Sequence, residues 1–369
     1  MATIKPLAQD GSSQSGNGHS NGHAPRILVT GGGGYIGSVL VGRLLARGYK
    51  VRVLDALYWG TRPLSGLLER IELVQGDIRH IRDEWLDGVD AVAHLAGLSN
   101  DPTAEYDPQA NWEMNAIGTE RLAEACKRQG IERFTFGSSC SLYDGLPPGD
   151  MYDEEAEIRP MGAYAEGKLY AEQRLAKLTD ERFCPVVLRQ ATVFGFSTRM
   201  RYDLVVNTFV KDAMSLGRLQ LHGAGSMSRP LVDVVDVADA HVVSLEAPAE
   251  AVRGQIFNVV QENYQIRELA TLVATALRTQ NYPVELVSVP PPPRIRDYRC
   301  SNDKMTQALG FTPHRTIPGS IAHMISWIRS DGYMEFDNPK FYNIRWMELL
   351  KERDEPPSTA RESIAASPA

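Results

Sequence analysis

A chain of 369 residues is long enough for two lobes with separate cores. Its net charge of −7, without any basic block, argues against nucleic-acid binding. The 43% of hydrophobic residues form no run of about 18 that could cross a membrane. Because the four cysteines, Cys126, Cys140, Cys184 and Cys300, show no CxxC spacing and the N-terminus lacks the apolar core of a signal peptide, we expect reduced thiols, no metal site and a cytoplasmic location.

The first part of the chain alternates strands with helices. Residues 1–24 are rich in Gly, Ser, Asn and His, a composition that predicts a disordered tail. Continuous Val/Ile/Leu runs favour strands buried on both faces, and apolar residues three or four apart favour helices. These patterns predict strands at 26–30, 51–55, 71–77, 90–97, 133–139 and 185–190, and helices at 35–47, 108–129 and 162–178. The succession indicates an α/β fold, a doubly wound parallel-sheet Rossmann domain over residues 25–195.

Beyond residue 195 this alternation loosens. Helices are expected near 203–216, 236–246 and 266–278. We therefore expect a smaller, mixed, substrate-binding lobe over residues 196–350, with segments such as 256–260 returning to the first sheet. The charged and then Ser/Ala-rich end, 351–369, is expected to be a flexible tail.

The segment RILVTGGGGYIGS (26–38) places Gly31, Gly34 and Gly37 between the first strand and the first helix. Such spacing arises readily by chance, so its context has to support it. A strand precedes it, an amphipathic helix follows, and Asp55 ends the next strand. A dinucleotide site uses the first glycine for a tight turn, the second for close approach of a pyrophosphate and the third for helix–strand packing. The alternative is a glycine turn without a ligand.

Two acids follow neighbouring strands. Asp55 is expected to accept hydrogen bonds from the adenosine ribose, and its charge would repel a 2′-phosphate, which favours NAD over NADP. Asp77, in GDI, either meets the adenine edge or simply ends its strand.

Tyr164 and Lys168 lie one helical turn apart in YAEGK. A free phenol, with a pKa of about 10, is a poor base at neutral pH. An ammonium about 4 Å away contributes roughly 4 kcal/mol at an effective dielectric constant of 20. We therefore expect Lys168 to lower the pKa of the Tyr164 phenol by up to about three, before desolvation is counted. A hydroxyl partner for Tyr164 is expected at the end of the strand predicted at 133–139, from Ser138, Ser139 or Ser141.

Nine segments occur in a characteristic order over about residues 25–330: TGGGGYIGS, LDAL, GDI, HLAG, NAIGT, SSCSLY, YAEGK, RPLVDVVDVADA and DYRCSNDK. In this order they resemble the extended short-chain dehydrogenase/reductase family, and within it the NAD-dependent nucleotide-sugar epimerase/dehydratase group. The resemblance implies bound NAD, a nucleotide-sugar substrate and a homodimer formed through the helices at 108–129 and 162–178.

The resemblance also assigns roles to residues of this chain. It implies Tyr164 as general base, Lys168 as the residue that binds the nicotinamide ribose, and Ser139 as the hydroxyl partner. His94 matches the fourth-strand segment, although it could equally be a packed strand residue. The implied cofactor-binding residues are Gly31, Gly34, Tyr35, Ile36, Gly37, Asp55, Asp77, Ile78, Leu95, Ala96, Asn115 and Lys168.

The substrate residues that the resemblance implies come from both lobes. Arg229 suits a diphosphate because a guanidinium binds phosphate with two parallel hydrogen bonds. Arg294 and Arg296 are looser candidates that could simply be solvated. The full set is Ser139, Ser141, Tyr164, Asn207, Arg229, Tyr298, Arg294 and Arg296.

Two of the chain's departures from the group's pattern bear on its function. Dehydratases of the group carry Asp-Glu directly after the catalytic Ser/Thr, where this chain has Cys140 and Ser141. Their absence argues against sugar 4,6-dehydration. The charged insert RMRYD (199–203) carries Arg199, Arg201 and Asp203, which either read a carboxylate or unusual sugar or form a surface loop.

Three functional hypotheses follow. The first is an NAD-dependent epimerase that oxidises a nucleotide-activated sugar transiently at C4. The second is a net reductase or dehydrogenase of a keto sugar or another carbonyl on the same scaffold. The third is a dinucleotide-binding protein without catalysis, which the retained Tyr164–Lys168 pair argues against.

Overall fold

The computed structural model describes residues 24–354 except 292–295 and 331. The predicted N-terminal tail therefore lies outside the described residues, apart from Ala24, and so does Arg294. The predicted C-terminal tail begins inside helix α12 (Asn343–Asp354), which continues beyond Lys351.

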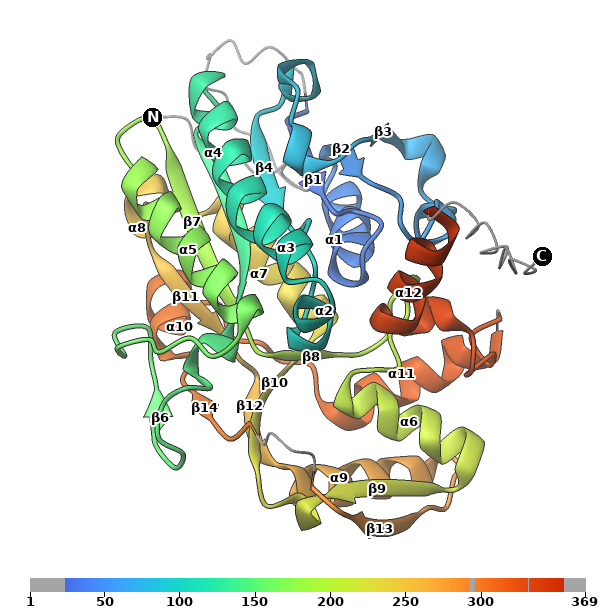
Figure 1. The fold of residues 1–369 in the computed structure, drawn as a ribbon. Helices are drawn as coiled ribbons and strands as arrows, with labels where there is room; N and C mark the ends of the chain where they lie inside the picture. Colours follow the sequence, from blue (N-terminus) through green and yellow to red (C-terminus); the bar gives the residue numbers. More distant parts are fainter. Residues whose placement is uncertain (1–23, 292–295, 331, 355–369) are drawn as a thin grey trace, which may run out of the picture.

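Seven parallel strands form the main sheet, in the order β11-β7-β5-β4-β1-β2-β3 (Figure 1). Every predicted strand is present, and the 256–260 segment returns to this sheet as its outermost strand, beside β7. The strand bounds are β1 Arg26–Thr30, β2 Lys50–Asp55, β3 Ile71–Gln75, β4 Ala91–His94, β5 Arg133–Ser139, β7 Cys184–Gln190 and β11 Ile256–Val259.

Helices cover both faces of this sheet, so the doubly wound α/β prediction is confirmed. Helix α1 (Tyr35–Ala46) packs beside α7 (Val234–Glu246) on one face, where Leu40 and Leu44 share a core with Val242. Helices α4 (Thr119–Arg128) and α5 (Ala163–Leu178) cover the other face (Figure 1). Full burial of each leucine stabilises the fold by roughly 1.5–3 kcal/mol.

The single helix predicted at 108–129 is instead divided. After α2 (Asp101–Tyr106), a short α3 (Pro108–Asn111) leads through a π-helical turn, Trp112–Gly118, into α4. Within this wide turn, the Asn115 side-chain amide donates to the Leu98 carbonyl at 2.8 Å and to Asn111 Oδ1 at 2.6 Å. The π-turn thus ties the helix to the loop after β4, in keeping with the frequent location of such turns at functional sites.

A second lobe with its own core lies below the carboxyl ends of the main strands (Figure 1). Its helices bury Phe209, Leu269 and Ile321 together. One mixed three-stranded sheet and two parallel strand pairs lie in this region, in agreement with the predicted mixed architecture of the C-terminal part. The elements of this region are β8 Thr192–Phe194, β10 Ser228–Asp233 and β12 Glu262–Gln265 in one sheet, β9 Arg218–His222 with β13 Glu285–Val289, β6 Met151–Tyr152 with β14 Arg299–Cys300, and helices α6 Val205–Leu216, α9 Ile266–Thr279 and α11 Ile317–Ser330. Two further helices pack on the main sheet, α8 Ala249–Val252 against β7 and α10 Asp303–Leu309 against β11.

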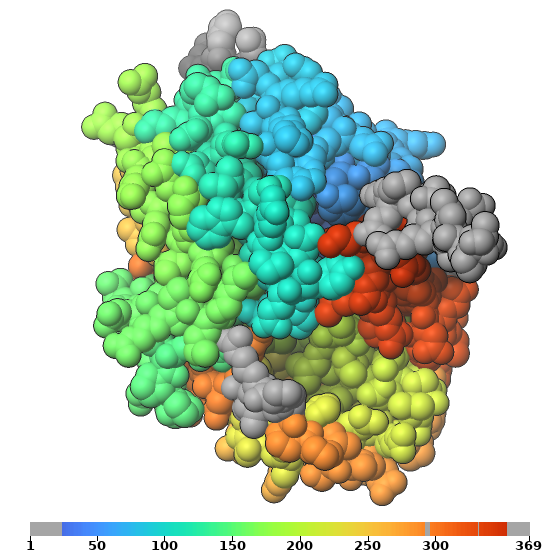
Figure 2. Space-filling view, in the orientation of Figure 1, coloured from blue at the N-terminus to red at the C-terminus, as the bar shows by residue number. Residues whose placement is uncertain are grey.

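The strand order reverses at β1, which lies between β2 and β4. Open α/β sheets bind ligands at the carboxyl ends of the strands beside such a reversal. The last helix, α12, lies next to this edge, and Figure 2 shows it (red) packed against the teal segment that contains α2 and α3. The functional site is therefore expected between the sheet edge, the second lobe and α12.

Candidate active site

The glycine-rich turn has the shape that close approach of a ligand requires. Gly31 has a φ of +72°, and a Cβ there would lie 2.7 Å from the Ala96 amide nitrogen. A Cβ on Gly37 would lie 2.1 Å from the Gly31 carbonyl oxygen. The first glycine thus permits the turn and the third permits the packing of α1 on β1, as predicted from their spacing.

Two adjoining cavities of about 230 and 70 Å³ open beside this turn. Gly31, Gly34, Trp59, Leu95 and Gly97 line both of them. The smaller one also contains Asp55, Asp77, Ile78 and Ala96, and the larger one contains Tyr35, Ile36 and Gly37. A continuous groove over bare backbone at the N-terminus of a helix fits a dinucleotide, with its adenosine in the smaller cavity.

The carboxylates of the smaller cavity are held by local hydrogen bonds. Asp55 accepts from the Gly33 amide at 2.8 Å and from the Leu57 amide at 2.7 Å, while burial raises its pKa. Each oxygen keeps a lone pair for a ribose hydroxyl. Burial also acts to raise the pKa of Asp77, but hydrogen bonds from Arg79 lower it overall.

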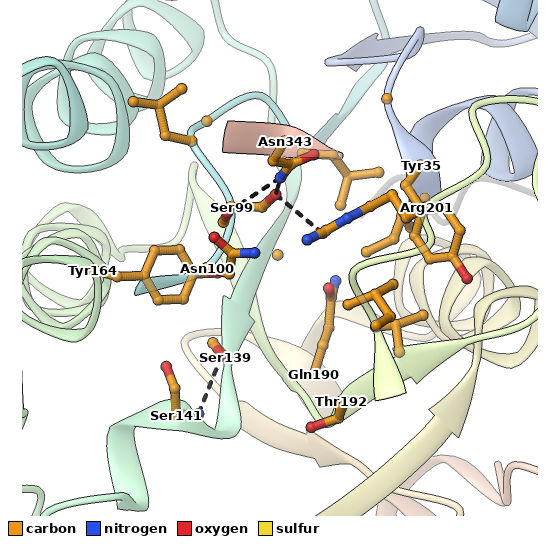
Figure 3. Close-up of a pocket in the computed structure, with 18 of the residues that line it drawn as sticks. Tyr35, Ser99, Asn100, Ser139, Ser141, Tyr164, Gln190, Thr192, Arg201 and Asn343 are labelled. Atoms are coloured by element: carbon orange, nitrogen blue, oxygen red, sulfur yellow. Dashed lines mark hydrogen bonds between the residues drawn. The ribbon is translucent and has the colours of Figure 1, made fainter. Parts of the chain in front are cut away.

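The predicted catalytic residues meet in the larger cavity. Ser139 ends β5, and Tyr164 and Lys168 lie on successive turns of α5 (Figure 3). The Ser139 hydroxyl oxygen accepts a hydrogen bond from the Ser141 amide at 3.1 Å, and a hydrogen bond from Ser139 acts to lower the pKa of Tyr164. The Ser141 hydroxyl also lines the cavity and has no hydrogen-bond partner among the described residues.

Desolvation, which the prediction for Tyr164 left out, determines the direction of its pKa shift, and Lys168 is not among the groups that oppose it. Burial raises the pKa of the phenol, and Ser139, Arg201 and the Asn100 backbone oppose the rise. The Lys168 ammonium donates to the Gly137 carbonyl at 2.9 Å and lies 5.8 Å from the centre of the Tyr164 ring. Burial lowers the pKa of Lys168 to about 8. In the protein without cofactor, desolvation therefore outweighs the ammonium as an influence on the phenol.

Ser138, the third serine predicted as a hydroxyl partner, is hydrogen-bonded elsewhere. It donates to the Glu172 carboxylate at 2.5 Å, and that carboxylate forms a buried ion pair with Arg189 at 2.8 Å. Cys140 is fully buried and donates from its thiol to the Arg189 carbonyl at 3.1 Å. Of the three predicted serines, Ser139 and Ser141 are therefore the ones whose hydroxyl groups are available to a ligand.

The substrate residues predicted in the second lobe are only partly brought together. Arg296 and Tyr298 line the larger cavity, and Arg296 pairs with Asp101. Arg229 stacks over Tyr298 at 5.6 Å and donates to the Arg296 carbonyl, but it does not line the cavity. Asn207 is fully buried and bonds to Gly195, Tyr35 and Arg201, so it supports the cavity wall instead of facing a ligand.

Two further predicted positions lie behind the cavity wall. Asn115 holds the loop at Leu98, as described above, and a Cβ on Gly97 would lie 2.0 Å from its Oδ1. His94 is fully buried between the Thr30 and Thr119 hydroxyls, at 2.6 and 2.9 Å. His94 is thus a packed strand residue, one of the two alternatives for it.

The RMRYD insert is part of the cavity and not a surface loop. Arg199 and Arg201 are 4% and 6% exposed, and both line the larger cavity. Arg201 forms two hydrogen bonds with Asp203, at 2.8 and 3.0 Å, and donates to Ser99 Oγ at 3.2 Å. Its guanidinium points into the cavity opposite Tyr164 (Figure 3).

Sequence reasoning missed several cavity residues. Two of them lie in loops that follow predicted strands, a location that could have drawn attention to them. They are Trp59, four residues beyond Asp55, and Asn100, which has a φ of +75°. Asn343 comes from α12 and had no sequence signal. The polar and aromatic lining residues that were not predicted as site residues include Trp59, Ser99, Asn100, Asp101, Gln190, Thr192 and Asn343.

Other kinds of site find no support in the described part of the chain. Nowhere in it do three or more His, Cys, Asp or Glu side chains gather in a group that could hold a metal ion. Every helix described is too short or too polar to span a membrane. The four cysteines are buried and unpaired.

Comparisons with known proteins agree with this geometry. The model of the NAD dependent epimerase/dehydratase family matches residues 27–259. The chain is 32% identical to the UDP-glucose 4-epimerase of Mycolicibacterium smegmatis, over 83% of this chain and 99% of that protein. The UDP-glucose 4-epimerase of Azospirillum brasilense is 29% identical, over 83% of this chain and 93% of that protein.

Solved structures give the same result. The UDP-glucose 4-epimerase of Thermus thermophilus in complex with NAD has a TM-score of 0.71 and 28% identity, covering 83% of this chain and 99% of that one. The dTDP-glucose 4,6-dehydratase DesIV of Streptomyces venezuelae, with NAD and TYD bound, has a TM-score of 0.74 and 25% identity, covering 84% and 99%. Because the family model spans the whole main sheet and the mycobacterial relative aligns over most of the chain, this protein belongs to the NAD-dependent epimerase/dehydratase family.

Proposed function

We propose that the protein is an NAD-dependent 4-epimerase of a nucleotide-activated sugar. The observation that carries this proposal is the shared cavity: Ser139, Tyr164 and Lys168 line the same space as the glycine-rich turn. The relatives that align over most of this chain are UDP-glucose 4-epimerases. A uridine diphosphate sugar is therefore the substrate class that we propose.

The residues divide the proton chemistry among them. Bound NAD would supply the acceptor and donor of the hydride that leaves the sugar carbon and returns to its opposite face. Tyr164 accepts the hydroxyl proton at C4 and gives it back, and Ser139 donates a hydrogen bond to the same oxygen. Lys168, on the turn of α5 after Tyr164, holds the nicotinamide ribose. Arg201, which faces the phenol, stabilises its anionic form.

The walls of the larger cavity favour epimerisation over dehydration. Elimination of water needs an additional acid and base beside the sugar. Cys140 is buried with its thiol bonded to the Arg189 carbonyl, and Ser141 carries only a hydroxyl. Among the described lining residues, Asp101 is the one carboxylate, and it is paired with Arg296.

A net reductase is the second candidate, because the same residues would serve it. The two differ in the fate of the cofactor. An epimerase regenerates NAD in each cycle, so the purified protein should carry bound NAD and convert a UDP-sugar without added NADH. We propose absorbance of the purified protein together with NMR of a UDP-sugar panel as the test. If product formed only when stoichiometric NADH was added, the result would contradict the epimerase proposal and favour the reductase.

Two further properties belong to the proposal. A homodimer through α5 and the π-turn is favoured by Trp112, which is 40% exposed and packs at a tilt against Tyr170, with the ring centres 5.0 Å apart. A molar mass from light scattering equal to that of the monomer would reject the homodimer.

The four unpaired cysteines favour a reducing compartment, so we propose a cytoplasmic location, which fractionation would test.

A further inference from the structure

Two buried hydrogen-bond donors of the larger cavity lack an acceptor among the described residues. They are Nη1 of Arg199, in the loop between β8 and α6, and Nε1 of Trp59, in the loop after β2. The Arg199 guanidinium lies over the Trp59 ring, 4.1 Å from its centre. Buried donors without acceptors are rare in folded proteins and carry a desolvation cost. Two of them side by side indicate a ligand that offers acceptor oxygens.

Arg199 also lacks a carboxylate at hydrogen-bonding distance among the described residues. Its other terminal nitrogen donates to the neutral amide oxygen of Asn343. The nearby carboxylate of Asp203 is occupied by both hydrogen bonds from Arg201. A buried cation without a paired anion is costly, and here burial lowers the pKa of Arg199 to about 9. The missing partner should therefore carry negative charge.

The loop that carries Arg199 is anchored at the N-terminus of α1. Ser197 Oγ donates to the Tyr35 carbonyl at 2.7 Å, and it lies 2.9 Å from Ser38 Oγ. The Tyr35 hydroxyl donates to the Gly195 carbonyl at 2.6 Å. This end of the loop is thus fixed to the helix whose first amides and preceding glycines form the dinucleotide cradle.

We propose that Arg199 and Trp59 bind the pyrophosphate of NAD from the side opposite the glycine-rich turn. The cradle supplies backbone amides on one side, and this pair supplies a guanidinium and an indole N–H on the other. The anion is then held between two lobes of the protein. The site depends on the family's NAD and not on which sugar is turned over, so it can be tested independently of the proposed reaction.

Helix α12 completes this arrangement. The Asn343 side-chain amide nitrogen, opposite the oxygen that receives Arg199, donates to Ser99 Oγ at 2.8 Å. The Trp346 indole donates to the Tyr58 carbonyl at 2.6 Å. The helix therefore bridges the two loops that border the groove and orients Arg199 from behind. Asn343 is a positioning residue, because it acts through Arg199.

Titration of the cofactor-free protein with NAD, ADP-ribose, adenosine and UDP tests the site. Arg199→Gln should weaken NAD and ADP-ribose binding at least about tenfold, because a charged hydrogen bond is lost. Trp59→Phe, which keeps the ring and removes only the N–H, should weaken both about two- to tenfold. Adenosine, which has no pyrophosphate, and UDP should bind as they do to the unchanged protein. Arg218→Gln, an exposed position on β9, is the charge-matched control.

Thermal melting separates binding from a structural role. The cofactor-free Arg199→Gln protein should melt no lower than the unchanged protein, because an unpaired buried charge has been removed. Added NAD should raise its melting temperature less than it raises that of the unchanged protein. The double variant Arg199→Gln/Asn343→Ala should bind NAD no more weakly than Arg199→Gln alone. An NAD affinity of Arg199→Gln within twofold of the unchanged protein would overturn the proposal. So would a loss confined to UDP-sugars that carry a carboxylate.

Discussion

Arg201 and Tyr164 face each other across the larger cavity, and this guanidinium is the cation that opposes the rise in the pKa of the phenol (Figure 3). The sequence pattern had assigned that influence to Lys168. Arg201 comes from an insert that could equally have been a surface loop, so its effect on a residue of α5 depends on the tertiary fold.

The pH dependence of turnover should therefore depend on Arg201. Because Arg201 is paired with Asp203, the double variant Arg201→Gln/Asp203→Asn removes the cation without leaving an unpaired carboxylate. Its rate should rise with pH along a curve displaced to higher pH, since the phenol has lost a stabilising charge. Arg201→Lys, which keeps the charge, should show a smaller displacement. A profile unchanged in the double variant would remove Arg201 from the proton chemistry.

Tyr164→Phe tests the base directly. The phenylalanine ring fills the same space but cannot take a proton, so kcat should fall by about 10²–10⁴. NAD affinity should stay within a few-fold, because the predicted dinucleotide contacts come from other residues. Single-turnover kinetics and NAD titration give the two values. An unchanged kcat would eliminate the assignment of the base.

The succession of strands and helices along the chain and the glycine-rich turn could be predicted because both follow from local patterns. Buried strands read as continuous apolar runs, and the glycine spacing reflects contacts within about seven residues. The contribution of α12 could not be predicted, since Asn343 meets Arg199 across more than a hundred residues of chain. The division of the 108–129 helix was also missed, because a π-turn leaves the apolar pattern almost intact. Desolvation of Tyr164 depends on packing around α5, which no spacing encodes.

Gly37 and Gly42 provide a matched pair within α1. A Cβ at Gly37 would lie 2.1 Å from a backbone oxygen, whereas a Cβ at Gly42 meets nothing within 4 Å. Gly37→Ala should therefore destabilise the protein by at least about 1–3 kcal/mol. Gly42→Ala should stabilise it by up to about 1 kcal/mol, because alanine is the better helix former. Urea denaturation measures both, and equal effects of the two changes would contradict the packing role of Gly37.

Burial of His94 should make the folding stability of the protein sensitive to acid. Burial, assisted by the charge of Lys168, lowers the pKa of His94 to about 3. Because the unfolded chain binds this proton from about pH 6.5 downward, the contribution of His94 to stability is lost as the pH falls through that range. At pH 5 the loss is about 2 kcal/mol. Between pH 7 and pH 5 the melting temperature of His94→Asn should fall less than that of the unchanged protein.

His80→Asn is the control for this comparison, because His80 is exposed. Its melting temperature should fall between pH 7 and pH 5 as far as that of the unchanged protein. If the melting temperature of His94→Asn fell as far as those of the unchanged protein and His80→Asn, burial would not be keeping the His94 imidazole neutral.

The most direct test of the proposed epimerase is the fate of a deuterium at C4 of UDP-glucose. The purified protein, given UDP-[4-²H]glucose and no added cofactor, should form UDP-galactose that retains the deuterium at C4, because the hydride leaves and returns within one active site. Loss of the label to solvent, or its appearance in free NADH beside a keto sugar, would contradict the proposal.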